Sequence, residues 1–200
     1  MTVLLVGCGA LAREMVALRD RHGWDARILA LPARLHLTPK RIPQAVAQRI
    51  KEQRDSFERV IVVYGDCGTG GLLDAELQAL SVERIAGPHC YEQYIGEEGF
   101  AALMEEEPGT FFLTDYLVQS FDHLVIEVLG LDRYPELRDQ YFANYRRIVY
   151  LQQRDDPALR AKAESAAQEL NLPIEIRFTG LGALETRLLA LLNSLPTSQE

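Results

Sequence analysis

Short apolar runs alternate with longer segments of helical periodicity along most of this chain. The runs that predict strands are 2–6, 27–31, 60–64, 83–86, 110–113, 147–151 and 174–178. Between them, apolar residues recur at intervals of three and four, which predicts helices over 10–22, 43–55, 72–80, 91–106, 115–129, 134–144, 156–170 and 181–192. This alternation predicts a three-layer α/β fold, in which helices cover both faces of a doubly wound, mainly parallel sheet.

Turn residues mark several boundaries of these elements. Gly23 stands where the first long helix should end, and Pro108-Gly109 precedes the strand at 110–113. Asp156 followed by Pro157 is typical of a helix start. No segment has the composition of a linker, so we expect a single α/β domain over residues 1–195 and a frayed tail at 196–200.

Composition and charge narrow the class of protein. The chain of 200 residues is 48% hydrophobic and 25% charged, as in ordinary soluble domains. Its net charge of -8 argues against nucleic acid or an anionic membrane surface as a partner. No apolar run approaches the roughly 18 residues of a membrane span. We therefore expect a cytoplasmic protein that acts on a small-molecule substrate.

The three cysteines share one sequence context. Cys8, Cys67 and Cys90 each follow a predicted strand, in a turn that contains glycine. An odd number of cysteines in such a chain argues against a disulfide framework. Ligand sites in open parallel sheets gather at the carboxyl ends of the strands. If the three strands are neighbours, the thiols converge there.

A shared metal site is the interpretation that this context favours. Thiolates are soft ligands suited to zinc or iron–sulfur clusters, and three protein ligands with one open position are typical of a catalytic metal. We predict zinc on Cys8, Cys67 and Cys90, with a [4Fe-4S] cluster on the same residues as the alternative. Side chains that could orient the site or carry protons are Asp66, His36 and His89. Glycines whose backbone N–H groups could bind a cofactor or anion are Gly68, Gly70 and Gly71.

Other interpretations of the same residues stay open. The cysteines could be inert buried hydrophobes, or two of them could form a redox pair beside a spare thiol. The segment GCGALA (7–12) is similar to a dinucleotide fingerprint, but no acidic residue ends the second predicted strand. The loop GDCGTGG (65–71) is similar to a phosphate loop without its lysine.

A series of motifs resembles the family catalogued as domain of unknown function 1638. They are Cys8-Gly9, Leu35-His36 with Pro39, Tyr64-Gly65-x-Cys67-Gly68, the His/Cys segment before Gly96, Pro108 to Phe112, and the tyrosine-rich segment 141–151. Genes of this family often lie beside those of corrinoid-dependent methyltransferases. The resemblance implies a role in one-carbon or methyl-transfer metabolism, with a corrinoid protein or methyltransferase as partner. It is compatible with a metal-dependent enzyme of transferase or lyase type, a [4Fe-4S] Lewis-acid enzyme, or a non-catalytic metal carrier.

Overall fold

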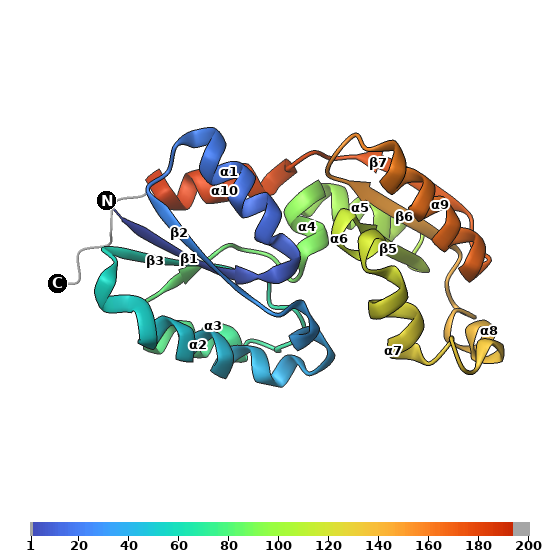
Figure 1. Ribbon diagram of the computed structural model, residues 1–200, viewed down its shortest axis with the longest axis horizontal. Coiled ribbons are helices and arrows are strands. Elements are labelled where there is room, and N and C mark those ends of the chain that lie inside the picture. Colours follow the sequence, from blue (N-terminus) through green and yellow to red (C-terminus); the bar gives the residue numbers. More distant parts are fainter. Residues whose placement is uncertain (1, 194–200) are drawn as a thin grey trace. The chain divides into compact units, whose positions relative to one another are not determined.

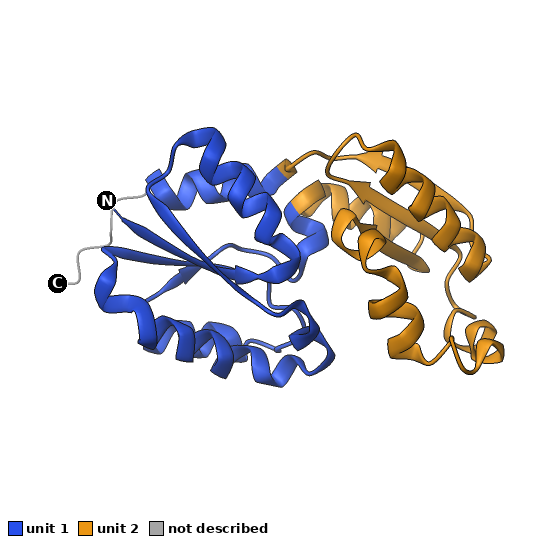
Figure 2. Ribbon diagram, viewed as in Figure 1, with its two compact units in different colours: residues 1–93, 183–200 blue, residues 94–182 orange. Residues whose placement is uncertain are grey.

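The chain forms two compact units. The computed structural model describes residues 2–193. Unit 1 comprises residues 1–93 and 183–200, and unit 2 comprises residues 94–182 (Figure 2). The sequence predicted one domain over 1–195, whereas the described residues fall into two units. The predicted tail at 196–200 lies outside the described residues.

Unit 1 is built on a four-stranded parallel sheet with the order β2-β1-β3-β4. Its strands are β1 (Val3–Cys8), β2 (Ala26–Leu31), β3 (Arg59–Val63) and β4 (Glu83–Arg84). Helices α1 (Ala12–His22) and α10 (Gly182–Asn193) cover one face, and α2 (Ile42–Gln53) and α3 (Leu72–Ala79) cover the other (Figure 1). Because both faces are covered, β1 and β3 are nearly continuous apolar runs.

The strand order creates a switch point between β1 and β3. From β1 the chain crosses to β2 on one side, and it later returns to β3 on the other side. Such points are where open α/β sheets bind ligands. Gly7 pairs with Val63, so the carboxyl ends of β1 and β3 are nearly level. The connections contain four short helices, η1 (Gly9–Leu11), η2 (Ala33–Leu37), η3 (Pro39–Arg41) and η4 (Arg54–Ser56).

Unit 2 contains a three-stranded parallel sheet with the order β5-β6-β7. Its strands are β5 (Thr110–Thr114), β6 (Arg147–Gln152) and β7 (Ile174–Phe178). In its core, Ile148 and Tyr150 of β6 pack with the alanine-rich α9 (Pro157–Leu170). The remaining helices are α5 (Glu97–Glu106), α6 (Asp115–Gln119), η5 (Asp122–Ile126), α7 (Glu127–Leu129), η6 (Pro135–Leu137) and α8 (Arg138–Tyr141). Helix α4 (Cys90–Ile95) begins in unit 1 and ends in unit 2.

The α/β class and the parallel strands are confirmed, but the strands form two sheets where one was expected. Three predicted helices are also interrupted. The helix at 91–106 breaks at Gly96, whose φ of 81° is not helical. The helix at 115–129 contains a π-helical turn, and 134–144 yields only η6 and α8. Within residues 2–193, no helix is both long and apolar enough to cross a membrane.

Candidate metal centre

The three cysteines lie at the carboxyl edge of the unit 1 sheet. Cys8 is the last residue of β1, Cys67 lies in the loop after β3, and Cys90 opens α4 after β4. Because β1, β3 and β4 are neighbours in the sheet, all three thiols come to one side of it. None of them forms a disulfide. From the sequence we expected the thiols to converge only if these strands were neighbours. The strands are neighbours, so the thiols do converge.

Backbone pairing draws the loops of Cys67 and Cys90 together. The N–H of Asp66 donates to Gly87 O at 3.0 Å, and that of Cys67 donates to Pro88 O at 2.6 Å. Gly65 permits this approach, because a Cβ there would stand 2.8 Å from the backbone N and Cα of His89. Any side chain at position 65 would push the two loops apart.

Cys67 adopts a backbone conformation that cysteine rarely takes. Its φ is 51°, in the left-handed region. For a non-glycine residue this conformation costs on the order of 1 kcal/mol, and such residues are concentrated at functional sites. Glycine would adopt it without that cost. A cysteine at this position therefore indicates that the side chain itself is needed.

Burial raises the pKa of all three thiols, and the proximity of other cysteines adds to the effect for Cys67 and Cys90. Burial raises the pKa of Cys67 to about 12, and the neighbouring Cys8 adds to the effect. Burial also raises the pKa of Cys90, again with contributions from Cys67 and Cys8. For Cys8, burial outweighs the hydrogen bond that its Sγ accepts from Ala10 N at 3.3 Å. The thiols are thus neutral at pH 7, and ionisation of one disfavours ionisation of the others.

The thiols are neighbours without forming a closed coordination shell. Within residues 2–193, no group of three or more His, Cys, Asp or Glu side chains has an arrangement that could hold a metal ion. The donor types nevertheless suit a soft metal. Metal binding at these residues therefore requires an arrangement of side chains other than the one described.

His36 lies beside the thiols, as the sequence predicted for a proton carrier or orienting group. Its Nδ1 is 4.0 Å from Cys8 Sγ and 2.8 Å from Ala33 O. Since a carbonyl oxygen only accepts, Nδ1 carries a proton and donates it to Ala33. This bond fixes the ring, which stacks on Tyr64 with centroids 6.1 Å apart.

His89 contributes through its backbone and its contact with Tyr91. The two rings are tilted, with centroids 5.2 Å apart. Burial lowers the pKa of His89, although the charge of Glu92 opposes the effect. The imidazole is therefore neutral at pH 7. Its backbone is the part that packs against Gly65.

Asp66 holds the glycine loop in shape. Its carboxylate accepts hydrogen bonds from Thr69 Oγ1 at 2.6 Å, Gly70 N at 3.1 Å and Gly71 N at 2.9 Å. Burial acts to raise its pKa, but these bonds and the charge of Arg84 outweigh it and the pKa lies below its usual value. The geometry thus gives Asp66 a structural task in the loop, and its predicted role in orienting the site or carrying protons stays a prediction.

The glycines of this loop are shaped for the turn. Gly68, Gly70 and Gly71 have φ values of 80°, 64° and 83°. Two of the three N–H groups that the sequence assigned to an anion or cofactor already donate to Asp66. A negative charge within the loop therefore occupies the place where such an anion was expected.

Three further residues of the site escaped the sequence analysis. Tyr64, directly after β3, is 0% exposed, and burial together with Cys8 and Cys67 raises its pKa. Glu14 is 5% exposed on α1, near enough to Cys90 to raise the pKa of that thiol. Arg187 of α10 donates to Glu92 Oε1 at 2.7 Å and to Ala86 O at 3.0 Å, which fixes the segment before Cys90.

A sequence signal existed for two of these, since Tyr64 also stands in the motif Tyr64-Gly65-x-Cys67-Gly68. Glu14 falls inside the apolar stripe of its helix, between Leu11 and Leu18, so its burial could have been anticipated. Tyr64 continues an apolar strand and looks like core. Arg187 acts across a long sequence separation that no local pattern reveals.

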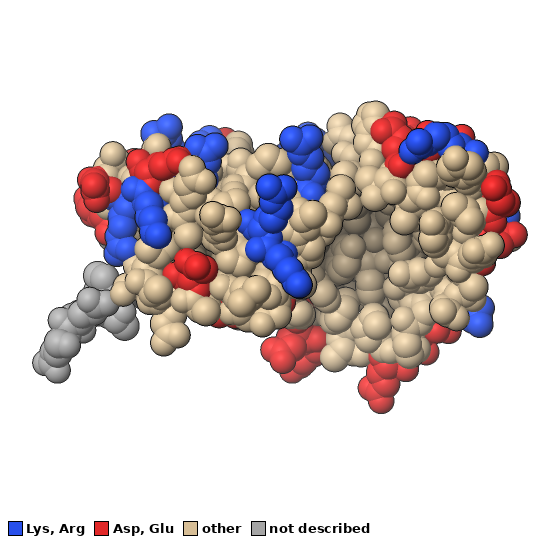
Figure 3. Space-filling view, turned by 90° about the horizontal axis from the view of Figure 1, so that it is seen from below, with Lys and Arg blue, Asp and Glu red and all other residues tan. Residues whose placement is uncertain are grey.

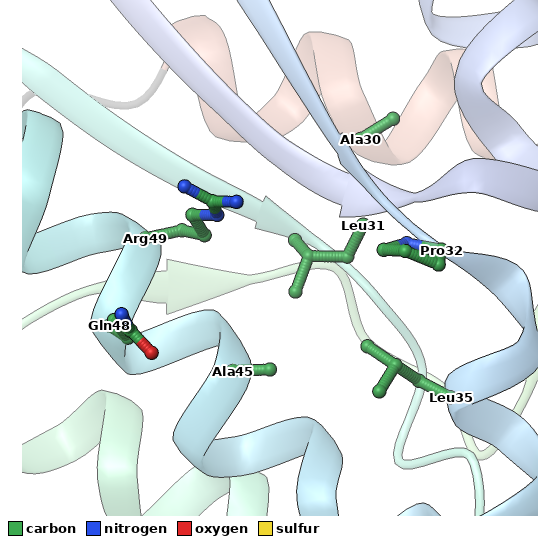
Figure 4. Close-up of a pocket in the computed structure, with 7 residues that line it drawn as sticks. All are labelled: Ala30, Leu31, Pro32, Leu35, Ala45, Gln48 and Arg49. Carbon is green, nitrogen blue, oxygen red and sulfur yellow. The ribbon is translucent and has the colours of Figure 1, made fainter.

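A separate cavity of about 280 Å³ opens near the end of β2 (Figure 4). Its lining residues come from β2, the segment that follows it and α2: Ala30, Leu31, Pro32, Leu35, Ala45, Gln48 and Arg49. None of the three cysteines lines it, so it is distinct from the thiol cluster.

Comparison with known proteins identifies one family. The model described as "Protein of unknown function (DUF1638)" matches residues 30–188. This range includes Cys67 and Cys90 and begins after Cys8. No curated protein and no solved structure matches the chain.

Proposed function

Since the chain belongs to the DUF1638 family, whose description assigns no activity, we propose a function from the thiol cluster itself. Cys8, Cys67 and Cys90 bind one soft metal ion, in the first place zinc, and leave a position open for a small thiol or methylated substrate. The protein then serves methyl-group transfer in the cytoplasm, beside a corrinoid protein or a methyltransferase.

The convergence of three thiols, one buried and two half-buried, at a switch point carries this proposal. Three neutral thiols packed together offer little hydrogen bonding, and three thiolates would repel one another. A divalent cation removes this conflict, because it ionises the sulfurs and neutralises most of their charge. The unusual backbone of Cys67 supports a need for its side chain in particular.

Other side chains of the cluster suit supporting tasks. His36, fixed by Ala33 O and 4.0 Å from Cys8 Sγ, is placed to orient this ligand or to exchange a proton with it. Asp66 and its glycine loop hold Cys67 in position. Arg187 does the same for the segment that leads to Cys90.

The link to methyl transfer rests on chemistry and on the resemblance to the family. Zinc held by thiolates lowers the pKa of a bound thiol and so prepares it to accept a methyl group. On the face seen in Figure 3, Lys and Arg stand in small separate groups among acidic and uncharged residues. This distribution supports a protein or small molecule as partner over nucleic acid.

Metal analysis of protein purified without oxygen tests the proposal. Wild type should contain about one zinc per chain, and Cys8→Ala, Cys67→Ala and Cys90→Ala should each lose it. His123→Ala is the matched control, because it removes an exposed histidine of unit 2 that could bind metal adventitiously. It should keep the zinc.

Each result has a definite meaning. About four irons with sulfide, lost in the same three variants, would replace zinc by the [4Fe-4S] alternative on the same residues. A wild type without metal, or cysteine variants that all keep it, would overturn the shared site. If metal binds but only a purified methyltransferase or corrinoid protein gains activity from it, the role is that of a non-catalytic carrier.

A further inference from the structure

The cavity near the end of β2 combines apolar walls with one charged side chain. Its apolar lining residues are Ala30, Leu31, Pro32, Leu35 and Ala45. The other two are Gln48 and Arg49, which are adjacent in α2. Figure 4 shows Leu31 between the Arg49 side chain on one side and Pro32 on the other. The volume of about 280 Å³ is close to the lower end of the range found for small-molecule pockets.

The chain around this cavity is basic, although the whole protein is acidic. All lining residues fall within 26–51, a run that contains six Lys or Arg residues and no Asp or Glu. The net charge of the whole chain is -8. All six basic side chains of the run are exposed: Arg27, Arg34, Lys40, Arg41, Arg49 and Lys51. A local excess of positive charge attracts anions, so an anion is the kind of ligand that this part of unit 1 favours.

Arg49 keeps donors for such a ligand. Its Nη1 donates to Glu52 Oε2 at 2.9 Å, and Gln48 Nε2 donates to Glu52 Oε1 at 2.8 Å. A guanidinium has five N–H donors, so the bond to Glu52 leaves those on Nε and Nη2 for a ligand. The side chains of Arg49 and Glu52 are 55% and 39% exposed, and water weakens an ion pair of this kind. An incoming carboxylate therefore meets Arg49 without first breaking a strong contact.

We propose that this cavity binds a small carboxylic acid with a compact apolar body, in its ionised form. The carboxylate accepts hydrogen bonds from Arg49, and the apolar body contacts Leu31 and Leu35. A planar guanidinium matches a planar carboxylate in two parallel hydrogen bonds, whereas phosphate sites usually gather several cations or a helix N-terminus. Arg49 is the one cation that lines the cavity, and it lies beyond the first turn of α2 (Ile42–Gln53). The apolar walls favour a ligand with apolar surface to bury.

This site is independent of the proposed metal site. None of the three cysteines lines the cavity. Helix η2 connects the two places, because Leu35 lines the cavity and the next residue, His36, lies 4.0 Å from Cys8 Sγ. Since the acid binds through Arg49 and apolar contacts alone, its binding requires no metal. Failure of either proposal leaves the other standing.

Titration of nitrogen-labelled wild type with benzoate, followed by proton–nitrogen correlation NMR, tests the proposal. Benzyl alcohol is the uncharged ligand of similar shape, and inorganic phosphate is the anion without an apolar body. Benzoate should shift the amide signals of Leu31, Leu35 and Gln48 saturably, with a dissociation constant in the millimolar range that so small a ligand allows. Benzyl alcohol and phosphate should each bind at least about 10-fold more weakly, because each lacks one of the two contacts.

Variants separate the charge from the apolar contact. Arg49→Gln should weaken benzoate binding about 10-fold and leave the affinity for benzyl alcohol unchanged, a pattern that a general loss of structure would not give. Arg13→Gln is the matched control, because Arg13 is also an exposed arginine of unit 1 but belongs to α1, which covers the opposite face of the sheet (Figure 1). It should bind both ligands like wild type. Ala45→Met keeps a good helix former in α2 and fills the cavity, so it should weaken binding of both ligands.

Several results would overturn the inference. Wild type that shows no saturable shifts with benzoate would do so, as would benzyl alcohol or phosphate that binds as tightly as benzoate. Arg49→Gln protein that binds benzoate like wild type, or that loses both ligands equally, would remove the role of the guanidinium. Benzoate affinity that Ala45→Met leaves unchanged would place the ligand outside the cavity. Thermal unfolding of each variant verifies that the fold is retained.

Discussion

The carboxyl edges of the two sheets both gather buried polar groups, but they satisfy them differently. In unit 2 the carboxylate of Asp115 accepts hydrogen bonds from Tyr150 Oη at 2.7 Å, Gln153 N at 2.9 Å and Arg154 Nε at 3.0 Å. In unit 1 the corresponding edge holds three thiols and the Tyr64 hydroxyl, which interacts with the Cys8 thiol but meets no acceptor in good hydrogen-bond geometry among residues 2–193.

This difference separates a network whose polar groups satisfy one another from a cluster whose polar groups have few partners of their own. Asp115 ties β5 to β6, and its partners leave little capacity for a bound molecule. Gln152 Nε2 is the one member of that edge without an acceptor among the described residues. At the unit 1 edge, by contrast, the polar groups would gain hydrogen bonds from a bound molecule.

Asp115→Ala should give the largest effect, a loss of about 3–5 kcal/mol in the free energy of unfolding. The change leaves the Tyr150 hydroxyl and the Gln153 N–H buried without their acceptor. Urea denaturation measures it. Asp139→Ala, at an exposed aspartate of the same unit, should stay within about 0.5 kcal/mol of wild type. A loss no larger than that of this control would contradict the structural role of the network.

The pair Tyr150→Phe and Tyr64→Phe sharpens the comparison. Tyr150→Phe removes a hydrogen bond to a buried carboxylate and should cost about 1.5–3 kcal/mol. Tyr64→Phe removes a hydroxyl that meets no acceptor in good geometry among the described residues, so metal-free protein should be as stable as wild type or slightly more stable. Both values come from the same denaturation experiment. Equal losses in the two variants would erase the distinction between the edges.

Alkaline pH should destabilise the metal-free protein through unit 1. Since burial holds the pKa of Cys67 at about 12 against an ordinary 9.0, the unfolded chain loses this proton first. The stability that follows from this raised pKa is fully present below pH 9. It is lost as the pH rises toward 12, and the free energy of unfolding falls by up to about 1.4 kcal/mol per pH unit for each such thiol. Denaturation at about pH 8, 9 and 10 measures the slope.

Two further samples identify the source of this slope. Cys67→Ala should show a shallower decline, because one thiol no longer titrates. Zinc-loaded wild type should show almost none, because the metal holds the sulfurs ionised. A flat profile for metal-free wild type would contradict the raised thiol pKa values.

Substitutions at Cys67 give the smallest expected effect. In metal-free protein, Cys67→Gly should be more stable than Cys67→Ala by about 0.5–1 kcal/mol, because only glycine adopts the left-handed backbone without strain. Ala10 does not have a positive φ, so the order should reverse there. Ala10→Gly should be less stable than wild type, which has alanine at this position. Thermal unfolding distinguishes the pairs. If Cys67→Ala were more stable than Cys67→Gly, the backbone of the loop would not be strained at this position.

Local patterns predicted most elements of the fold but not their grouping. The strand at 174–178 and the helix start at Asp156 follow from periodicity and capping, which act over a few residues. The division into two sheets depends on which strands pair, and every parallel run has the same apolar appearance. The sequence therefore indicated strands correctly and joined them into one sheet.

The candidate site was predictable to a similar degree. Strand ends and glycine turns brought Cys8, Cys67 and Cys90 together correctly, since the rule for parallel sheets needs only neighbouring strands. The same pattern could not tell that Gly70 and Gly71 donate to Asp66, because that choice depends on side-chain rotamers. It also gave no indication that the Tyr64 hydroxyl is buried without an acceptor in good geometry among the described residues.

The return of α10 to unit 1 has a consequence for the order in which the protein is made on the ribosome. Unit 2 is continuous from 94 to 182, so it can emerge and fold before the last helix is synthesised. Only then can Glu185 reach Arg21 and Arg187 fix Glu92 beside the Cys90 segment. The segment around Cys90 is thus fixed only after α10 has been synthesised.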